Sequence, residues 1–292
     1  MALTSPSINT TDQITLTKNI ALKKTGKQVR SLAITGGKGG VGKSNLAVNL
    51  AFELGALNYQ VGLLDADLGL ANADILCGIS PKFHLGHVVT GLKDLEDTII
   101  KLSDNVSLIP GGSGIEELAK FSFAAHPHIL AKLLMMEENL DFMLIDTAAG
   151  IAENVLSVLI SAAQVIIVAT PEPTSIVDAY ATIKVILRHA PKKSISIVVN
   201  NAVGIGDAEQ VFNSLNSAVQ NFLGHRVEFL GMIPHDAQLP QAVREQVPLV
   251  HFAPDSPASR AIRLIAKQLH NQKQKNTGFA EVQSFWDMLS KN

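Results

Sequence analysis

Cysteine is almost absent from this sequence: Cys77 is the only one among 292 residues. A single cysteine cannot form an intramolecular disulfide, and it cannot supply the several thiolates that hold an iron–sulfur cluster within one chain. Net charge is also small, −2 at pH 7 with a pI near 6.5, so the chain as a whole is not expected to bind nucleic acid directly. These scarcities favour a cytoplasmic protein.

Long hydrophobic runs are scarce as well. The longest stretch without a charged residue lies between Glu153 and Glu172, and polar residues interrupt it. We expect a helix followed by a buried strand there, not a membrane span. The opening residues, MALTSPSINTTDQ, lack a basic region followed by an apolar run and do not resemble a signal peptide. Hydrophobic residues still make up 47% of the chain, which is enough for a large buried core.

Apolar β-branched runs alternate with helical patterns along the chain. The predicted strands are Arg30–Thr35, Val61–Asp65, Val106–Ile109, Phe142–Asp146, Val165–Thr170, Ile195–Asn200 and Val227–Ile233. The helical patterns include Ser44–Leu57, Glu153–Ala163, Ser175–His189 and Ala208–Leu223, and a further helix follows Pro254 to about His270. This alternation predicts an α/β fold, a doubly wound and mainly parallel sheet with helices on both faces. We expect a flexible arm over 1–28, one domain over 29–270, and a linker with a C-terminal amphipathic helix over 271–292.

The stretch GGKGGVGKS contains a complete phosphate-loop signature, Gly37-x4-Gly42-Lys43-Ser44, between a predicted strand and a predicted helix. Glycines let backbone N–H groups converge on phosphate oxygens, and the helix N-terminus adds positive potential. Lys43 would neutralise the β- and γ-phosphates, and the Ser44 hydroxyl would ligate magnesium. The alternative is a glycine-rich turn without a ligand. The candidate nucleotide-binding residues of the loop are Gly37, Lys38, Gly39, Gly40, Val41, Gly42, Lys43, Ser44 and Asn45.

Two carboxylate stretches follow predicted strands, at the edge where open α/β sheets bind their ligands. Asp146 ends one apolar strand and is the candidate for holding magnesium through water. Asp65 and Asp67 lie two residues apart, so one could orient the attacking water while the other supports the metal. Taken singly, each aspartate could instead cap the helix that follows it.

The loop resembles the deviant phosphate loop of the MinD/ParA family of ATPases, whose mark is the additional lysine, here Lys38. LLDADLGLANADILCGI is similar to the family's first switch, and IDTAAG to the second switch with its magnesium-binding aspartate. VVNNAV matches the segment with the adenine-reading asparagine, here Asn200. GMIPHDAQLPQAVREQVPLV resembles the late adenine loop, which puts Ile233, Pro234 and Asp236 beside the base. The resemblance runs from about Val29 to His270.

This resemblance implies a P-loop ATPase domain over 29–270, with ATP or ADP and Mg²⁺ as cofactors. It also implies an ATP-dependent homodimer in which Lys38 of each subunit reaches the phosphates bound by the other. A second cation near the transferring phosphoryl group stabilises developing charge, as an arginine finger does. In the family, the aspartate equivalent to Asp67 positions the hydrolytic water. The implied catalytic residues are Lys38, Lys43 and Asp67, and the implied metal-binding residues are Ser44, Asp65 and Asp146.

Two further stretches, GLANAD and LIPGGSGIEELA (108–119), resemble the FlhG or FleN branch of the family. That branch regulates flagellar number, so a flagellar transcription regulator or a basal-body protein is an implied partner. DQITLTK (12–18) is partly similar to the motif by which the branch engages the GTPase FlhF. It departs from that motif at Ile14, Thr17 and Lys18, which leaves activation of the GTPase open.

The C-terminal segment carries an apolar stripe at helical spacing, formed by Phe279, Val282, Phe285, Trp286 and Leu289. The stripe predicts a helix that attaches the protein reversibly to the inner face of the cell membrane. The alternative is that the stripe docks onto the protein's own core, either always or until dimerisation releases it.

Three competing functions stay open. One is a cell-division or DNA-partitioning ATPase of the same family. Another is a group-transfer or metal-cluster enzyme that uses the same loop, which the lack of cysteine pairs disfavours. The third is a nucleotide-gated binding module with negligible turnover. Lys192 and Lys193 are interpreted as solvated, and so are Lys267, Lys273 and Lys275, although the latter group could assist binding to an anionic membrane.

Overall fold

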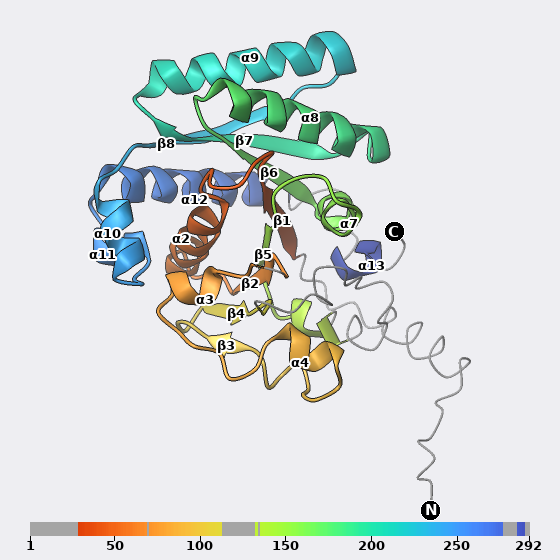
Figure 1. Cartoon of the computed structure of the whole chain (residues 1–292), viewed down its shortest axis with the longest axis vertical. Helices are drawn as coiled ribbons and strands as arrows, with labels where there is room; N and C mark the ends of the chain where they lie inside the picture. Colours follow the sequence, from red (N-terminus) through yellow and green to blue (C-terminus); the bar gives the residue numbers. More distant parts are fainter. Residues whose placement is uncertain (1–28, 69, 113–131, 134, 277–284, 290–292) are drawn as a thin grey trace, which may run out of the picture.

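An eight-stranded sheet forms the centre of the computed structural model, which describes residues 29–68, 70–112, 132–133, 135–276 and 285–289 (Figure 1). The strands are β1 (Arg30–Thr35), β2 (Val61–Ala66), β3 (Ile100–Lys101), β4 (Val106–Ile109), β5 (Phe142–Thr147), β6 (Gln164–Ala169), β7 (Ser194–Ala202) and β8 (Glu228–Pro234). Their order is β3-β4-β2-β5-β1-β6-β7-β8. The predicted arm 1–28 lies outside the described residues.

The predicted strands and the mainly parallel sheet are confirmed, with strand ends displaced by at most two residues. Strand β3 was not predicted. It has two residues and pairs antiparallel with β4, whereas the other neighbouring strands pair in parallel. So short a segment gives no periodic pattern from which a strand could be recognised.

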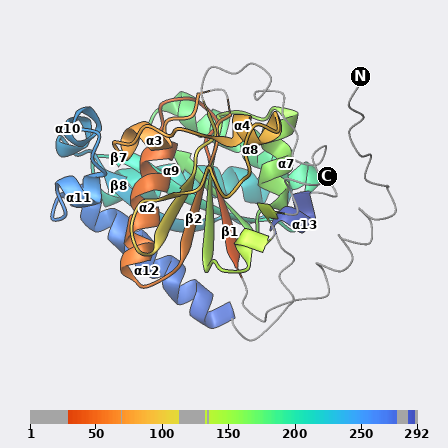
Figure 2. The ribbon, with the colours of Figure 1, turned by 90° about the horizontal axis from the view of Figure 1, so that it is seen from below.

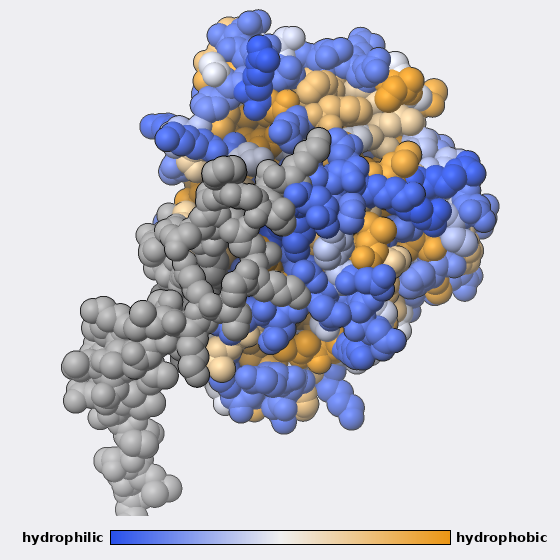
Figure 3. All heavy atoms as spheres, turned by 180° about the vertical axis from the view of Figure 1, so that it is seen from behind, coloured by the Kyte–Doolittle hydropathy of each residue, from blue (hydrophilic) through white to orange (hydrophobic). Residues whose placement is uncertain are grey.

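Helices cover both faces of the sheet (Figures 1 and 2). One face is covered by α2 (Lys43–Ala56), α3 (Ala73–Leu76), α10 (Gln238–Arg244), α11 (Leu249–Phe252) and α12 (Pro257–Asn276). The other is covered by α4 (Leu85–Val89), α7 (Glu153–Ser161), α8 (Pro173–His189), α9 (Ile205–Leu223) and α13 (Phe285–Leu289). The two hydrophobic cores therefore lie on opposite sides of one sheet. Seen from behind, most of the surface is hydrophilic, and hydrophobic side chains gather in its upper part (Figure 3).

Helix α12 continues to Asn276, so the linker predicted to begin at residue 271 is wrong for residues 271–276. Hydrogen bonds hold the last turns of the helix at the amino-terminal ends of strands β1 and β5. Arg30 donates hydrogen bonds to the Leu269 carbonyl (2.9 Å) and to Gln272 Oε1 (2.6 Å). Lys273 Nζ donates to the carbonyl of Asp141 at 3.0 Å. These long-range partners stabilise turns whose polar composition alone suggested a linker.

Helix α13 packs on α7, and its apolar side chains enter the core on that face of the sheet. Phe285 is 1% exposed and Leu289 is 2% exposed. The backbone N–H of Phe285 donates to Glu137 Oε1 at 3.2 Å. Phe279 and Val282 lie outside the described residues, and Trp286 is described only as part of the helix. For Phe285 and Leu289, the structure therefore shows docking on the protein's own core, the alternative to the predicted membrane contact. None of the helices in the described ranges is long and apolar enough to span a membrane.

Candidate nucleotide-binding site

The phosphate loop joins the end of β1 to the start of α2. Gly40 and Gly42 have φ of 78° and 97°, a left-handed conformation that residues with a Cβ rarely adopt. Gly42 is the residue directly before α2, so the loop leads into the N-terminus of this helix. Lys43 follows and is buried. This geometry directs the helix N-terminus and one buried cation toward the loop, as phosphate binding requires.

Two neighbouring elements clamp the loop from opposite sides. A Cβ on Gly37 would overlap the backbone of Asp178 in α8, and a Cβ on Gly42 would overlap the side-chain amide of Asn200. Asn200 Nδ2 also donates to the carbonyl of Val41 at 2.8 Å. Close packing against backbone thus requires glycine at position 37, whereas at position 42 the left-handed φ of 97° requires it as well as the contact with Asn200. The predicted adenine-reading asparagine lies directly against the loop.

Asp65 and Asp146 lie side by side because they are register partners at the ends of β2 and β5. Both are 1% exposed. Burial, together with the charge of the neighbouring Asp65, raises the pKa of Asp146 to about 7, although the Ser44 hydroxyl and the Lys43 charge act in the opposite direction. Neither carboxylate oxygen of Asp146 has a hydrogen-bond partner among the described residues. A buried carboxylate without a partner costs stability unless a cation or a donor compensates it.

Asp65 organises the loop that follows β2. Its Oδ2 accepts hydrogen bonds from the N–H groups of Asn72 and Ala73, both at 2.9 Å, and its Oδ1 accepts from Asp67 N–H at 3.2 Å. Burial raises the pKa of Asp65 to about 6, against these three hydrogen bonds. The Asp65 carboxylate, which was predicted to support a metal, therefore accepts hydrogen bonds from the backbone of the predicted first switch. One of these bonds fixes the backbone of Asp67.

The residues at this edge fit a magnesium–nucleotide complex. Ser44 is the second residue of α2, next to the loop, and Asp146 presents two buried oxygens without a hydrogen-bond partner in the described chain. Hard cations such as Mg²⁺ prefer hydroxyl, carboxylate and water oxygens of this kind. The second switch is joined to the loop, since Gly150 N–H donates to the Gly36 carbonyl at 3.3 Å. An ion held here would contact both the phosphate loop and a switch.

The residues predicted to surround the adenine come together at the ends of β7 and β8. Asn200 pairs in register with Ile233, and Ala202 pairs with Pro234. Asp236 lies just beyond, where its carboxylate accepts hydrogen bonds from Gln238 and Ala258 N–H groups, both at 2.9 Å. Burial alone would raise the pKa of Asp236, but these hydrogen bonds outweigh burial and lower it. The side chain of Asp236 thus stabilises the conformation of the loop after β8 by hydrogen bonds to backbone N–H groups.

Lys38 is held by its own chain. Its ammonium group forms an ion pair with Glu172, the residue before α8, and lies 3.4 Å from the hydroxyl of Thr174. The lysine side chain is 31% exposed and Glu172 is 59% exposed. Glu172 and Asp178 were not predicted from the sequence as part of the site. The only signal for them was their position, after a buried strand that ends at the same edge as the phosphate loop.

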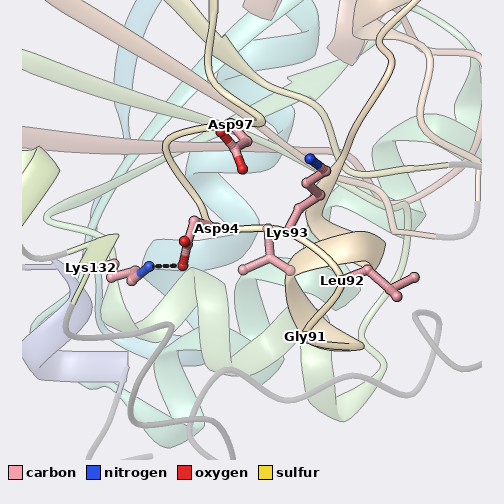
Figure 4. Close-up of a pocket in the computed structure, with 7 residues that line it drawn as sticks. Gly91, Leu92, Lys93, Asp94, Asp97 and Lys132 are labelled. Carbon is pink, nitrogen blue, oxygen red and sulfur yellow. Dashed lines mark hydrogen bonds and ion pairs between the residues drawn. The ribbon is translucent and has the colours of Figure 1, made fainter.

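A pocket of about 260 Å³ lies elsewhere, at the end of α4 (Figure 4). Lys132 closes one side of it through ion pairs with Asp94 and Glu96. The hydrogen bond from Lys132 lowers the pKa of Asp94, and the same contact raises the pKa of Lys132. Because this pocket lies away from the phosphate loop and its charges neutralise one another, it does not contribute to the nucleotide site.

Comparisons with known proteins agree with this geometry. The ParA family model described as "NUBPL iron-transfer P-loop NTPase" matches residues 27–270. The chain is 37% identical to the antiactivator FleN of Pseudomonas aeruginosa, over 82% of this chain and 86% of the relative. It is 34% identical to the flagellum site-determining protein YlxH of Helicobacter pylori, over 86% and 84%.

Among solved structures, the fold is similar to the septum site-determining protein MinD from Pyrococcus horikoshii, complexed with Mg-ADP. The TM-score is 0.71 at 25% identity, and the match covers 86% of this chain and 100% of that one.

Gly37→Ala is expected to lower both stability and nucleotide affinity, because the new Cβ would overlap the Asp178 backbone. Overpacking of this kind typically costs about 1–3 kcal/mol. Thermal melting and titration with a fluorescent ATP analogue would measure the two effects. Gly39→Ala is the matched control for stability, since a Cβ there meets nothing within 4 Å. Equal melting temperatures for the two variants would contradict the packing argument.

Asp146→Asn is expected to stabilise the nucleotide-free protein at pH 8. The native pKa of Asp146, about 7, exceeds that of an unfolded aspartate, about 3.9, so its destabilising effect grows as pH rises between these values. The gain at pH 8 is on the order of 4 kcal/mol, since the two pKa values differ by about 3, and it should vanish near pH 4. Melting curves across this range would measure it, with exposed Asp255→Asn as the control.

With Mg-ADP the wild type should be more stable than Asp146→Asn, because only the wild type has the Asp146 carboxylate to compensate the charge of Mg²⁺. A variant that is no more stable at pH 8 without nucleotide, or that gains as much from Mg-ADP, would show that Asp146 is not a carboxylate in need of a cation.

Proposed function

The chain belongs to the ParA/MinD family of P-loop NTPases, and we propose that it is a magnesium-dependent ATPase that regulates flagellar number and placement. The observation that carries the proposal is the similarity to two relatives, the antiactivator FleN and the flagellum site-determining protein YlxH. The site geometry supports the ATPase part. The phosphate loop, the two proposed switches and the proposed adenine loop all lie within residues 27–270, which the family model matches, and this supports their assignment to one site.

Each element of the site has a role in ATP hydrolysis. The loop amides and Lys43 bind the phosphates, and the oxygens of Ser44 and Asp146 hold Mg²⁺, directly or through water. When bound, the ion neutralises charge on the phosphate oxygens. Asp67, whose backbone N–H is fixed by Asp65, orients the attacking water. These roles assign hydrolysis to the edge of the sheet at which every one of these residues lies.

Hydrolysis is proposed to require a second copy of the chain. Apolar side chains are exposed around the carboxyl edge of the sheet: Leu70 is 72% exposed, Ile151 47%, Val177 66% and Val203 93%. They surround the same edge from which Lys38 projects, and a second copy placed face to face would cover them. An exposed ion pair contributes at most about 1 kcal/mol, so Lys38 can exchange Glu172 for the phosphates of a partner's nucleotide at little cost.

Dimerisation is further proposed to control reversible membrane attachment. In the single chain, Phe285 and Leu289 are buried against α7, the helix that directly follows the second switch. Rearrangement of that switch in a nucleotide-bound dimer would release α13. One short amphipathic segment binds a membrane weakly, since ordering it costs about 1–2 kcal/mol per residue. Two segments on one dimer bind far more tightly by effective concentration.

Two competing functions are less well supported. Similarity to MinD keeps a role in cell division open, although the two relatives named above are more alike in sequence. The family description refers to iron transfer. Burial raises the pKa of the one thiol, Cys77, to about 12, which disfavours the thiolate needed for ligation. Interaction with FlhF, a flagellar regulator or a basal-body protein belongs to the same proposal.

Lys38→Ala is expected to bind ATP with near-normal affinity but to lose ATP-dependent dimerisation and most hydrolysis. The reason is that Lys43 serves the subunit's own nucleotide, whereas Lys38 serves the partner's. Light scattering with a non-hydrolysable ATP analogue would measure the dimer, and phosphate release would measure turnover. Lys43→Ala is the contrasting variant, which should lose ATP binding itself. An undiminished ATP-driven dimer in Lys38→Ala would contradict the role assigned to this residue.

Deletion of the gene in its native host tests the cellular function. Supernumerary or misplaced flagella are expected, with normal septum position and plasmid retention. Complementation with the wild type should restore flagellar number, whereas complementation with Lys38→Ala should not. Normal flagella accompanied by misplaced septa or plasmid loss would favour one of the competing functions.

A further inference from the structure

A group of cations lies at the carboxyl ends of α8 and α9, on the face of the sheet that also carries α13. We define this α8–α9 rim as Lys184, Arg188, Lys192, Phe222 and Arg226. All five side chains are exposed, and Phe222 is 77% exposed. None of the ion pairs formed within the described part of the chain involves the four cations. The rim therefore presents unneutralised positive charge around one exposed aromatic ring.

The sequence around the rim is depleted of acidic residues. Between Ala179 and Val227 the acidic residues are Asp207 and Glu209, both in the first turns of α9, at the opposite end of that helix from Phe222. Glu228 follows at the start of β8, where its carboxylate accepts a hydrogen bond from Gln272. The whole chain carries a net charge of −2. A positive rim on a weakly acidic protein is a local feature that overall composition does not reveal.

Strand register brings the two halves of the rim together. Strands β7 and β8 are parallel neighbours, and Ser196 pairs with Glu228. Lys192 and Arg226 precede these strands by a few residues, so they reach the same edge of the sheet. Helices α8 and α9 pack against each other along their length, which places Arg188 and Phe222 in their adjacent last turns. Figure 1 shows the two helices running side by side above α7 and α13.

The rim and the docked tail belong to one continuous layer. Helix α7 contacts α8 on one side and α13 on the other, and all of these helices contribute to one hydrophobic core. Lys193, next to Lys192, donates hydrogen bonds to the carbonyls of Ile160 and Ala162 at the end of α7, both at 2.6 Å. If helix α13 dissociates from α7, it is therefore exposed on the same face of the sheet as the α8–α9 rim.

We propose that the α8–α9 rim is a second membrane-contact surface, which binds anionic lipid headgroups while the released tail inserts into the bilayer. This inference rests on the proposed membrane attachment. Stable anchoring of a peripheral protein takes two signals, such as one weak apolar insertion and one polybasic patch. The tail supplies the first and the rim supplies the second. Phe222 is positioned to enter the interface between the surrounding cations, as exposed aromatic side chains of peripheral proteins do.

The test compares three purified full-length proteins: the wild type, a rim variant with Arg188→Gln, Lys192→Gln and Arg226→Gln, and a control with Lys82→Gln, Arg260→Gln and Lys267→Gln. The control residues are exposed cations outside the rim, two of them on α12 on the opposite face. Cosedimentation with Mg-ATP is measured on vesicles of phosphatidylcholine, alone or mixed with phosphatidylglycerol. Each cation near an anionic surface strengthens partitioning about fivefold. The rim variant should therefore lose at least about tenfold in binding to the mixed vesicles.

The control should bind like the wild type, and both variants should keep wild-type melting temperature and ATPase rate. Phe222→Ser should weaken binding to both vesicle types without changing stability. Undiminished binding of the rim variant to mixed vesicles would overturn the rim proposal while leaving membrane attachment intact. Failure of the wild type to bind any vesicle would overturn membrane attachment and the rim together. Loss of duplex-DNA binding, with vesicle binding unchanged, would reassign the rim to nucleic acid.

Discussion

The structure depends on two buried aspartates that the parallel register forces side by side. Asp65 and Asp146 are register partners near the ends of neighbouring strands, and the negative charge of Asp65 raises the cost of burying Asp146 in its ionised form. Asp65 is stabilised by three backbone N–H groups, which is why the first switch folds over it. Asp146 has no such donors within the described chain, and a cation at this edge would compensate it. The electrostatics of the sheet thus favour the binding of a cation at this edge.

In the single chain, both Lys38 and helix α13, the two elements proposed to act on a partner or a membrane, contact other parts of the same chain. Lys38, expected to act on a partner, is paired with Glu172 of its own α8. Helix α13, expected to act on a membrane, is packed on α7. Helix α7 follows β5 and helix α8 follows β6, and both strands end at the edge that carries the phosphate loop. A conformational change at that edge can therefore alter both the Lys38–Glu172 ion pair and the packing of α13 on α7. We interpret the single chain as the inactive arrangement, from which dimerisation would release the Lys38 ammonium group and helix α13.

Much of this could be predicted from sequence, because the determining patterns are local. Continuous apolar runs gave the strands, and the glycine spacing with Lys43 gave the loop. Contacts distant in sequence could not be predicted. The sequence around Lys38 contains no signal for its ion pair with Glu172. The sequence around Lys192 likewise contains no signal for the proximity of Arg226, which follows from the register of β7 with β8. The end of α12 was missed because Arg30, 239 residues from Leu269, stabilises it. The apolar stripe of the tail was visible, but periodicity cannot distinguish a membrane from the chain's own core.

The central claim is that each active site is completed by Lys38 of another copy. Mixing Lys38→Ala with Asp67→Ala protein, each nearly inactive alone, tests it most directly through the ATPase rate. In a mixed dimer, the nucleotide on the Lys38→Ala subunit keeps its own Asp67 and receives Lys38 from its partner. Because Lys38→Ala subunits are not expected to dimerise with one another, the rate is divided by the measured amount of mixed dimer. Each mixed dimer has one intact site of two, so it should hydrolyse ATP at about half the rate of a wild-type dimer. No recovery, although mixed dimers form, would contradict the claim.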